Sequence, residues 1–221
     1  MNDIKTAELF DLSRTRAEKY LQNTTYPHEA LADIGSWILS IGRTLEAERF
    51  AHPFPDVWIA KSATVDPGAF IKGPCIIDED TEVRYGAFIR GNALVGKRCV
   101  VGNSTELKNV ILFDGVQVPH YNYVGDSILG YKAHMGAGAI TSNVKGDRSP
   151  VVIKSGTDNL PTGRKKVGAM LGDLAEIGCG CVLNPGTVIG KGAQVYPLTS
   201  VRGVIPADHI CKNEHCVVKK K

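Results

Sequence analysis

A six-residue repeat runs through most of this chain and limits the folds that it can adopt. An aliphatic residue stands at every sixth position without a break, namely at Ile59, Val65, Ile71, Ile77, Val83, Ile89, Val95, Val101 and Leu107. An α-helix has 3.6 residues per turn, so a period of six does not stay on one of its faces. The repeat therefore indicates something other than helices.

Small or thin residues follow the aliphatic ones at a fixed distance. They stand four positions after each of the first eight, at Ala63, Ala69, Cys75, Thr81, Ala87, Ala93, Cys99 and Thr105. Six residues are too few for a hairpin but suit one side of a three-sided coil, with the aliphatic side chain inward. Coils of 18 residues would stack ~4.8 Å apart, the spacing of hydrogen-bonded strands. The sequence thus predicts an all-β fold, a parallel β-helix, with many of its 24 glycines at corners of positive φ.

The repeat also divides the chain. It resumes at Leu112, is interrupted over residues 144–170, and returns from Leu171 to Val201. We expect a helical N-terminal module in residues 1–50, the β-helix in 51–205 with an inserted flap at 144–170, and a C-terminal tail in 206–221. Because the end coils of a repeat protein must be covered, we expect the helical module to close one end of the β-helix.

Composition excludes several classes of protein. A net charge of +3 is far from the dense basic surface of a nucleic-acid binder. There is no apolar run of ~20 residues and no secretion signal, so we expect a cytoplasmic protein without a membrane partner. In such a chain the six cysteines are expected to be reduced. Cys211, His215 and Cys216 are too few for a zinc site, which needs about four ligands, so no metal is expected.

Four segments carry a family resemblance: VGNSTELKN, VPHYNYVGD, MGAGAITSN and LNPGTVIGKGA. In them the chain resembles the acetyltransferase domain of the bacterial bifunctional enzyme that acetylates glucosamine-1-phosphate and then uridylylates it. The resemblance covers about residues 59–202 and implies a left-handed coil, a homotrimer, and acyl-CoA bound between neighbouring subunits, with acetyl-CoA as co-substrate. The glycine-rich signature of the nucleotidyltransferase half is absent, so no uridylyl transfer is expected from this chain.

Two cations are candidates for binding a phosphate. Arg90 and Lys108 are 18 residues apart, so they should stack on adjacent coils of one face. Like charges at that spacing repel unless solvent or an anion separates them. A phosphate would suit the pair, and the resemblance assigns both residues to phosphate binding.

The resemblance assigns further roles around these cations. His120 should point outward and falls on the position of the general base, while Tyr123 and Asn143 fall on substrate-binding positions. His134 stands where the family has a second substrate-binding asparagine, which indicates a different acceptor. For acyl-CoA the corresponding positions are Ala137, Cys179 and Pro197. The expected activity is acetyl transfer to an amino-sugar phosphate.

Two alternatives remain open. A non-catalytic β-helix that binds a sugar phosphate or nucleotide would keep the same groove. A γ-class carbonic anhydrase shares the fold but needs three histidine ligands, and His120 and His134 are the only two in the repeats.

The insertion at 144–170 is strongly basic. It holds Lys145, Arg148, Lys154, Arg164, Lys165 and Lys166 against Asp147 and Asp158, six basic against two acidic residues. Residues 159–163, Asn-Leu-Pro-Thr-Gly, indicate a turn between two extended arms. We expect a hairpin-like flap that leaves the coil, reaches a neighbouring subunit's groove and covers an anionic substrate.

Overall fold

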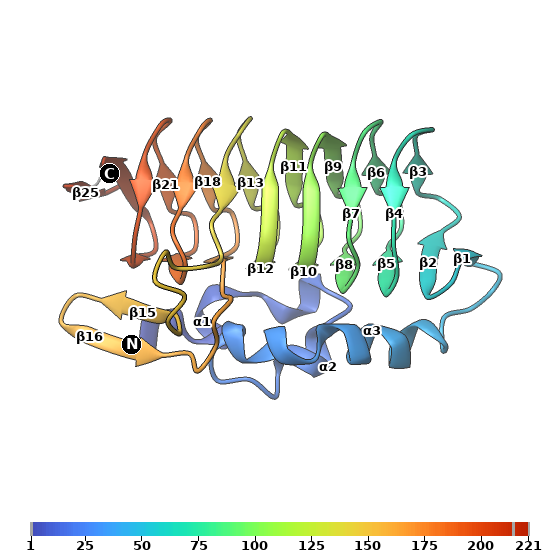
Figure 1. Cartoon of the computed structure of the whole chain (residues 1–221), viewed down its shortest axis with the longest axis horizontal. Coiled ribbons are helices and arrows are strands. Elements are labelled where there is room, and N and C mark those ends of the chain that lie inside the picture. The colour runs from blue at the N-terminus through green and yellow to red at the C-terminus, as the bar shows by residue number, and fades with distance from the viewer. Residues whose placement is uncertain (1, 214, 221) are drawn as a thin grey trace.

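The chain winds into a parallel β-helix with three faces, seen in a computed structural model that describes residues 2–213 and 215–220 (Figure 1). Met1, Glu214 and Lys221 lie outside the described residues, so one residue of the expected N-terminal module and two of the expected tail are not described. No helix in the described ranges is both long enough and apolar enough to cross a membrane.

Each coil passes through the first, second and third face in turn. The first face consists of β2 (Val57–Ala60), β5 (Cys75–Ile77), β8 (Ala93–Val95), the C-terminal halves of β10 (Glu106–Leu112) and β12 (Tyr123–Leu129), β17 (Ala169–Leu171), β20 (Thr187–Ile189) and β23 (Val204–Ile205). The second face consists of β3 (Thr64–Val65), β6 (Glu82–Val83), β9 (Val100–Asn103), β11 (Gln117–His120), β13 (His134–Met135), β18 (Glu176–Ile177), β21 (Gln194–Val195) and β24 (His209–Asn213). The third face consists of β4 (Phe70–Ile71), β7 (Phe88–Ile89), the N-terminal halves of β10 and β12, β14 (Ile140–Thr141), β19 (Val182–Leu183) and β22 (Ser200–Val201).

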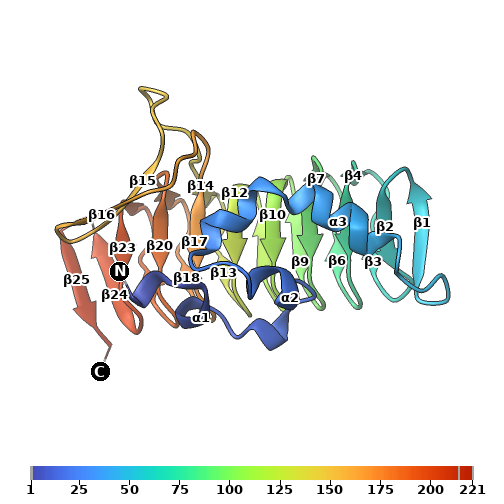
Figure 2. The same ribbon diagram turned by 90° about the horizontal axis from the view of Figure 1, so that it is seen from below.

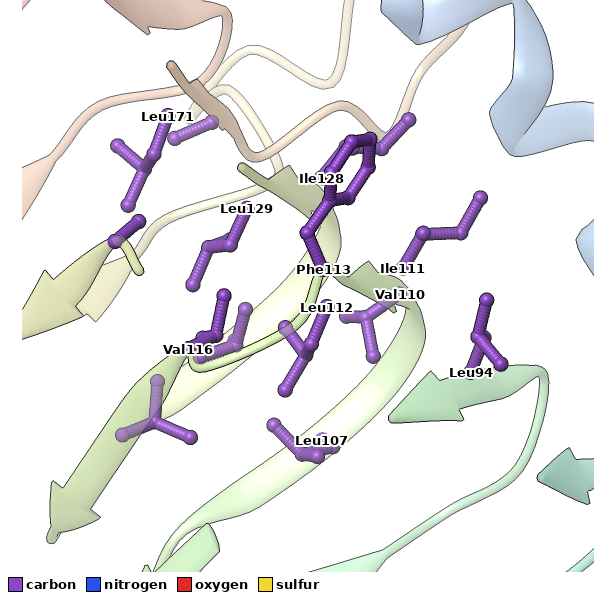
Figure 3. Packing of buried hydrophobic residues seen from close by; sticks show 14 of the residues in the cluster. Leu94, Leu107, Val110, Ile111, Leu112, Phe113, Val116, Ile128, Leu129 and Leu171 are labelled. Carbon is purple, nitrogen blue, oxygen red and sulfur yellow. The ribbon is translucent and has the colours of Figure 1, made fainter. Parts of the chain in front are cut away.

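The repeated aliphatic residues fill the interior, as the sequence predicts. From Ile77 to Val201 each of them is at most 3% exposed, and only Ile59, Val65 and Ile71 on the first coil are more open. Figure 3 shows part of this packing, in which the inward Leu112, Leu129 and Leu171 of successive coils follow one another in a row. Strand pairs advance by 18 residues in the early coils, as in Ile77↔Val95.

Glycine explains only some of the corners. Gly86 and Gly138 have positive φ, 77° and 71°, as predicted. Tyr121 and Asp126 adopt the same conformation, with φ of 53° and 49°, although a Cβ makes it less favourable. The corners are therefore held by the stacking of the coils as well as by residue choice.

The N-terminal module lies along the first face, and the expectation that it closes an end of the β-helix is wrong (Figures 1 and 2). It comprises η1 (Asn2–Ile4), α1 (Thr6–Leu9), η2 (Leu12–Arg14), α2 (Glu18–Leu21), η3 (Pro27–Ala32) and α3 (Ile34–Gly42). The helix α3 packs on β5, β8 and β10, and η3 packs on β12. The outward residues that it covers are themselves apolar, which is why the module lies there: Trp58, Ile76, Leu94, Ile111 and Ile128.

Antiparallel strands lie at the two ends instead. β1 (Phe50–Phe54) pairs with β2 at the first coil. At the other end β24 forms a hairpin with β25 (Cys216–Lys219), so residues in the expected C-terminal tail are part of the sheet.

The insertion forms a hairpin that packs on its own chain. β15 (Val152–Ser155) pairs antiparallel with β16 (Asp158–Pro161), so the chain turns at residues 156–157 and not at residues 159–163 as predicted. Val151 and Ile153 are buried, at 0% and 2% exposure, and β15 packs on β20 and β23. The insertion thus leaves the coil as a hairpin with a sheet of its own, as expected, but folds back so that the first face covers its apolar residues.

Candidate functional site

A buried carboxylate organises the corner between the third and first faces. Asp126 lies in β12 where the strand turns this corner and is 2% exposed. Its oxygens accept hydrogen bonds from Lys108 Nζ (3.0 and 3.1 Å), Asn109 Nδ2 (2.9 Å) and Asn143 Nδ2 (2.6 Å). A buried carboxylate is stable only when its charge is balanced and its lone pairs are occupied. Asp126 therefore fixes the three side chains around it.

Asn143 connects this corner to the third face. Its Nδ2 lies 3.2 Å from the hydroxyl of Tyr123 as well as bonding Asp126. Partial burial, together with the charge of Asp126, raises the pKa of Tyr123. The phenol thus keeps its proton at neutral pH and can donate it in a hydrogen bond.

Arg90 stacks beside Lys108, as its spacing predicts. The pairing Ile89↔Leu107 puts the two cations on adjacent coils. Each of them has its own carboxylate: Arg90 Nη1 lies 2.6 Å from Glu106 Oε1, and Lys108 pairs with Asp126. The repulsion between these cations is therefore reduced by carboxylates of the same chain.

The corner between the second and third faces carries a column of predicted site residues. Successive coils are joined there by Gly138 N to His120 O (3.0 Å), Gly180 N to Ala137 O (2.8 Å) and Leu198 N to Cys179 O (2.9 Å). This register stacks four residues of four consecutive coils, in the order His120, Ala137, Cys179 and Pro197. The expected base and the expected acyl-CoA positions thus share one edge of the prism, which we call the His120 column.

The side chains of the His120 column face solvent. All four residues are exposed. In residues 2–213 and 215–220 the imidazole of His120 has no hydrogen-bond partner, whereas its backbone N–H donates to Asn122 Oδ1 at 3.1 Å and its carbonyl accepts from Gly138 N. The ring is therefore free to bond an incoming ligand.

Comparisons with known proteins relate the chain to domains of enzymes that are already described. A family model described as the GMPPB C-terminal domain matches residues 71–155, which include Arg90, Lys108, His120 and Asn143. The chain is 32% identical over 170 residues to bifunctional protein GlmU of Methanococcus aeolicus, covering 68% of this chain and 41% of that protein. The chain contains a hexapeptide β-helix domain of the GlmU and GMPPB type.

Two further proteins are similar to this chain, one in sequence and one in its solved structure. The bifunctional sugar-1-phosphate nucleotidylyltransferase/acetyltransferase of Sulfurisphaera tokodaii is 30% identical over 151 residues, 60% of this chain and 38% of that protein. The chain thus spans about two fifths of these curated relatives. The acetyltransferase domain of PglB from Neisseria gonorrhoeae is 20% identical in its solved structure, with a TM-score of 0.39, over 77% of this chain and 60% of that one.

His134 lies apart from the other residues that we expected to bind the acceptor. It is on the second face, where its Nδ1 lies 2.9 Å from Glu176 Oε2. Tyr123 and Asn143 belong to the third face and its far corner. Within one chain the structure brings Lys108, Tyr123 and Asn143 together but leaves His134 on the face that ends at the His120 column.

Sequence reasoning missed the partners that hold these residues. Asp126, Asn109 and Glu106 were not among the candidates, although Asp126 follows Lys108 by 18 residues. The spacing that paired the two cations could have found it. As for metals, no group of three His, Cys, Asp or Glu residues in the described ranges is close enough to hold an ion.

Proposed function

We propose that this protein is an acyltransferase that moves an acyl group from a coenzyme A thioester to the amine of an amino-sugar phosphate, with acetyl-CoA as donor and a glucosamine-1-phosphate-like acceptor. One observation carries the proposal. The coil register stacks His120 with Ala137, Cys179 and Pro197 on one edge, and the third face joins that edge to the corner of Lys108 and Asn143. A base, a groove for the thioester and an anion-binding corner would thus lie on three adjoining parts of one surface.

His120 is the proposed general base. An amine must lose a proton before it can attack a thioester carbonyl, and imidazole, which titrates near ~6.5, accepts protons around neutral pH. The nitrogen then bonds to the carbonyl carbon, the carbon–sulfur bond breaks, and the coenzyme leaves as a thiolate that takes up a proton. The exposed imidazole of His120 supports this role because no other side chain in the described residues forms a hydrogen bond with it.

The acceptor would lie across the third face. Lys108 and Arg90 would attract its phosphate. Tyr123 would donate a hydrogen bond to its hydroxyl groups and Asn143 Oδ1 would accept one from them, since both N–H groups of Asn143 are bonded within the chain. In a homotrimer, His134 could reach the acceptor of an adjacent subunit. Exposed apolar side chains support association, since Phe70 is 59% and Phe88 40% exposed on this face.

A second candidate function is the binding of a sugar phosphate or nucleotide without catalysis. It is favoured by the match of residues 71–155 to a domain of GMPPB. Release of free thiol from acetyl-CoA, measured with a panel of hexosamine-1-phosphates, distinguishes the two. Acyl transfer predicts thiol release that depends on the amine. Binding of the sugar phosphates without thiol release, in protein of verified fold and oligomeric state, would overturn the acyltransferase proposal and leave the binding function.

A further inference from the structure

A cavity of about 510 Å³ lies where three parts of the chain meet. The β-helix contributes Lys108 and Asp126, the helical module contributes Leu31, and the flap contributes Arg164 to Lys166. The carbonyl of Leu31 accepts a hydrogen bond from Arg164 Nη2 at 3.2 Å, which ties the flap to the module between two residues that line this cavity. A volume of this size suits a small ligand. We call it the flap cavity.

The charges of the flap cavity are unbalanced. Four cations line it, Lys108, Arg164, Lys165 and Lys166, against the single carboxylate of Asp126, an excess of three positive charges. That carboxylate is already occupied by three donors. Lys165 and Lys166 are exposed, and neither has an ion-pair partner in the part of the chain that the structure describes. The cavity therefore has an excess of donors and lacks an acceptor.

An unpaired buried nitrogen of Arg164, a residue that lines the cavity, supports this conclusion independently. Arg164 Nε is buried without a hydrogen-bond partner in the described residues, and so is Nδ1 of His28, whose side chain is 4% exposed. Arg164 has five N–H groups, and leaving a buried one unpaired is costly. Burial lowers the pKa of His28; the charge of Glu29 opposes this shift and the charge of Arg164 adds to it. An acceptor bound at Arg164 would satisfy its unused donor.

We infer that the flap cavity binds the phosphate group of a phosphorylated small molecule, held within one chain by Lys108 from the coil and by Arg164, Lys165 and Lys166 from the flap. This inference rests on the proposed function for the identity of the ligand, which would be the amino-sugar phosphate acceptor. Arg90 does not line the cavity, so it would act on the phosphate only from the adjacent coil. The flap therefore adds phosphate-binding cations to the two that the sequence assigns, Arg90 and Lys108.

The position of the flap cavity fits this ligand. Asp126 is at its floor, and Asn143 bridges Asp126 to Tyr123 on the third face. A phosphate in the cavity would thus leave the sugar to extend over Tyr123 towards the His120 column.

The test measures binding of inorganic phosphate and of glucosamine-1-phosphate by calorimetry, without acyl donor. The variant Lys165→Gln/Lys166→Gln removes two exposed charges from the cavity. Lys212→Gln/Lys219→Gln removes two exposed charges from the C-terminal hairpin and is the matched control. We expect the flap variant to bind both ligands about tenfold or more weakly at low salt, with a smaller loss at high salt, and the control to bind as the parent does.

Three outcomes would overturn the inference. The parent binds neither ligand, or the parent and the flap variant bind equally well. In the third outcome the control is weakened as much as the flap variant, which would show that only the overall positive charge of the protein matters. The acyltransferase proposal fails separately. If phosphate binding depends on the flap but the protein releases no thiol, the inference about the flap cavity stands and the acyltransferase proposal fails. If the protein releases thiol but the flap variant has the same acceptor KM as the parent, the acyltransferase proposal stands and the inference about the flap cavity fails.

Discussion

Arg16 of the N-terminal module donates two hydrogen bonds to the carboxylate of Asp78 on the β-helix, from Nε at 2.8 Å and Nη2 at 2.9 Å. The Asp78 side chain is 1% exposed and that of Arg16 is 24% exposed. The pair links two segments 62 residues apart and fixes the module on the first face.

Replacing Arg16 by Gln should therefore destabilise the protein. The buried Asp78 carboxylate would lose its counter-charge, and removing one partner of a buried pair costs up to ~3–5 kcal/mol. Because Arg16 is partly exposed, we expect about 2–3 kcal/mol in urea unfolding. Arg84→Gln is the control, since its pair with Glu82 is 35% and 45% exposed and should contribute less than ~1 kcal/mol. Equal losses in the two variants would show that the Arg16 pair does not fix the module.

The β-helix could be predicted because its signal is strictly local. Each inward residue is fixed by a six-residue period, and the 18-residue coil then predicts which residues stack, such as Arg90 beside Lys108. Stacking identifies neighbours, but it does not say which neighbour carries the balancing charge. That is why the carboxylates of Glu106 and Asp126 were missed.

The position of the helical module could have been predicted from a second signal. The residue before the inward position of the first face is also apolar on coil after coil, as at Ile76, Leu94, Ile111 and Ile128. A solvent-facing strand would alternate with polar residues there. A sheet whose outward side chains are apolar as well as its inward ones must be covered on the outside. The amphipathic segment of the chain that lies outside the repeats and can cover it is the helical module.

The flap cavity could not have been predicted in the same way. It joins residues 31, 108 and 164, and the contact between Arg164 and Leu31 spans 133 residues. No periodicity relates these segments, because their proximity follows from how the module and the insertion each pack on the first face. The basic composition of the insertion predicted an anion but not its location.

Replacing His120 by Ala should lower the turnover number ~10²-fold or more, since general-base catalysis typically contributes that much. The exposed side chain makes no packing contribution that would change the fold. Turnover with saturating acceptor and acetyl-CoA is the measurement, and His209→Ala on the C-terminal hairpin is the control. If His120→Ala turns over at the parent rate with the true acceptor, another group is the base.

Loss of the Asp126 carboxylate should lower the free energy of unfolding more than loss of the ion pair between Arg90 and Glu106. In Asp126→Asn the ammonium of Lys108, 26% exposed, would lose its counter-charge and Asn143 would lose a charged acceptor. We expect a loss of roughly 1–3 kcal/mol in urea unfolding and a raised KM for the acceptor. The control Glu106→Gln breaks a more exposed pair and should cost less than ~1 kcal/mol. A larger loss in the control would contradict this ranking.

The protein should form a trimer in solution. Leu198 is 85% exposed beside the His120 column, and Phe70 and Phe88 are exposed on the third face, so an isolated chain leaves apolar surface in water. Light scattering at micromolar concentration should give about three times the 23.8 kDa of one chain. An active monomer would show that the site is complete in one chain.

Stability should fall as the pH is lowered through the range where histidine titrates, and His28 should be a cause. Burial lowers the pKa of His28 in the folded protein, whereas in the unfolded chain it returns to about 6.5. Below that pH the unfolded chain takes up a proton that the folded chain does not, so the free energy of unfolding decreases by up to about 1.4 kcal/mol per pH unit until the folded pKa is reached. His28→Gln removes the titration and should flatten the decline between about pH 7 and pH 5, while His209→Gln should keep it. The measurement is urea unfolding at each pH, and a His28→Gln protein with the parent slope would assign the decline to other groups.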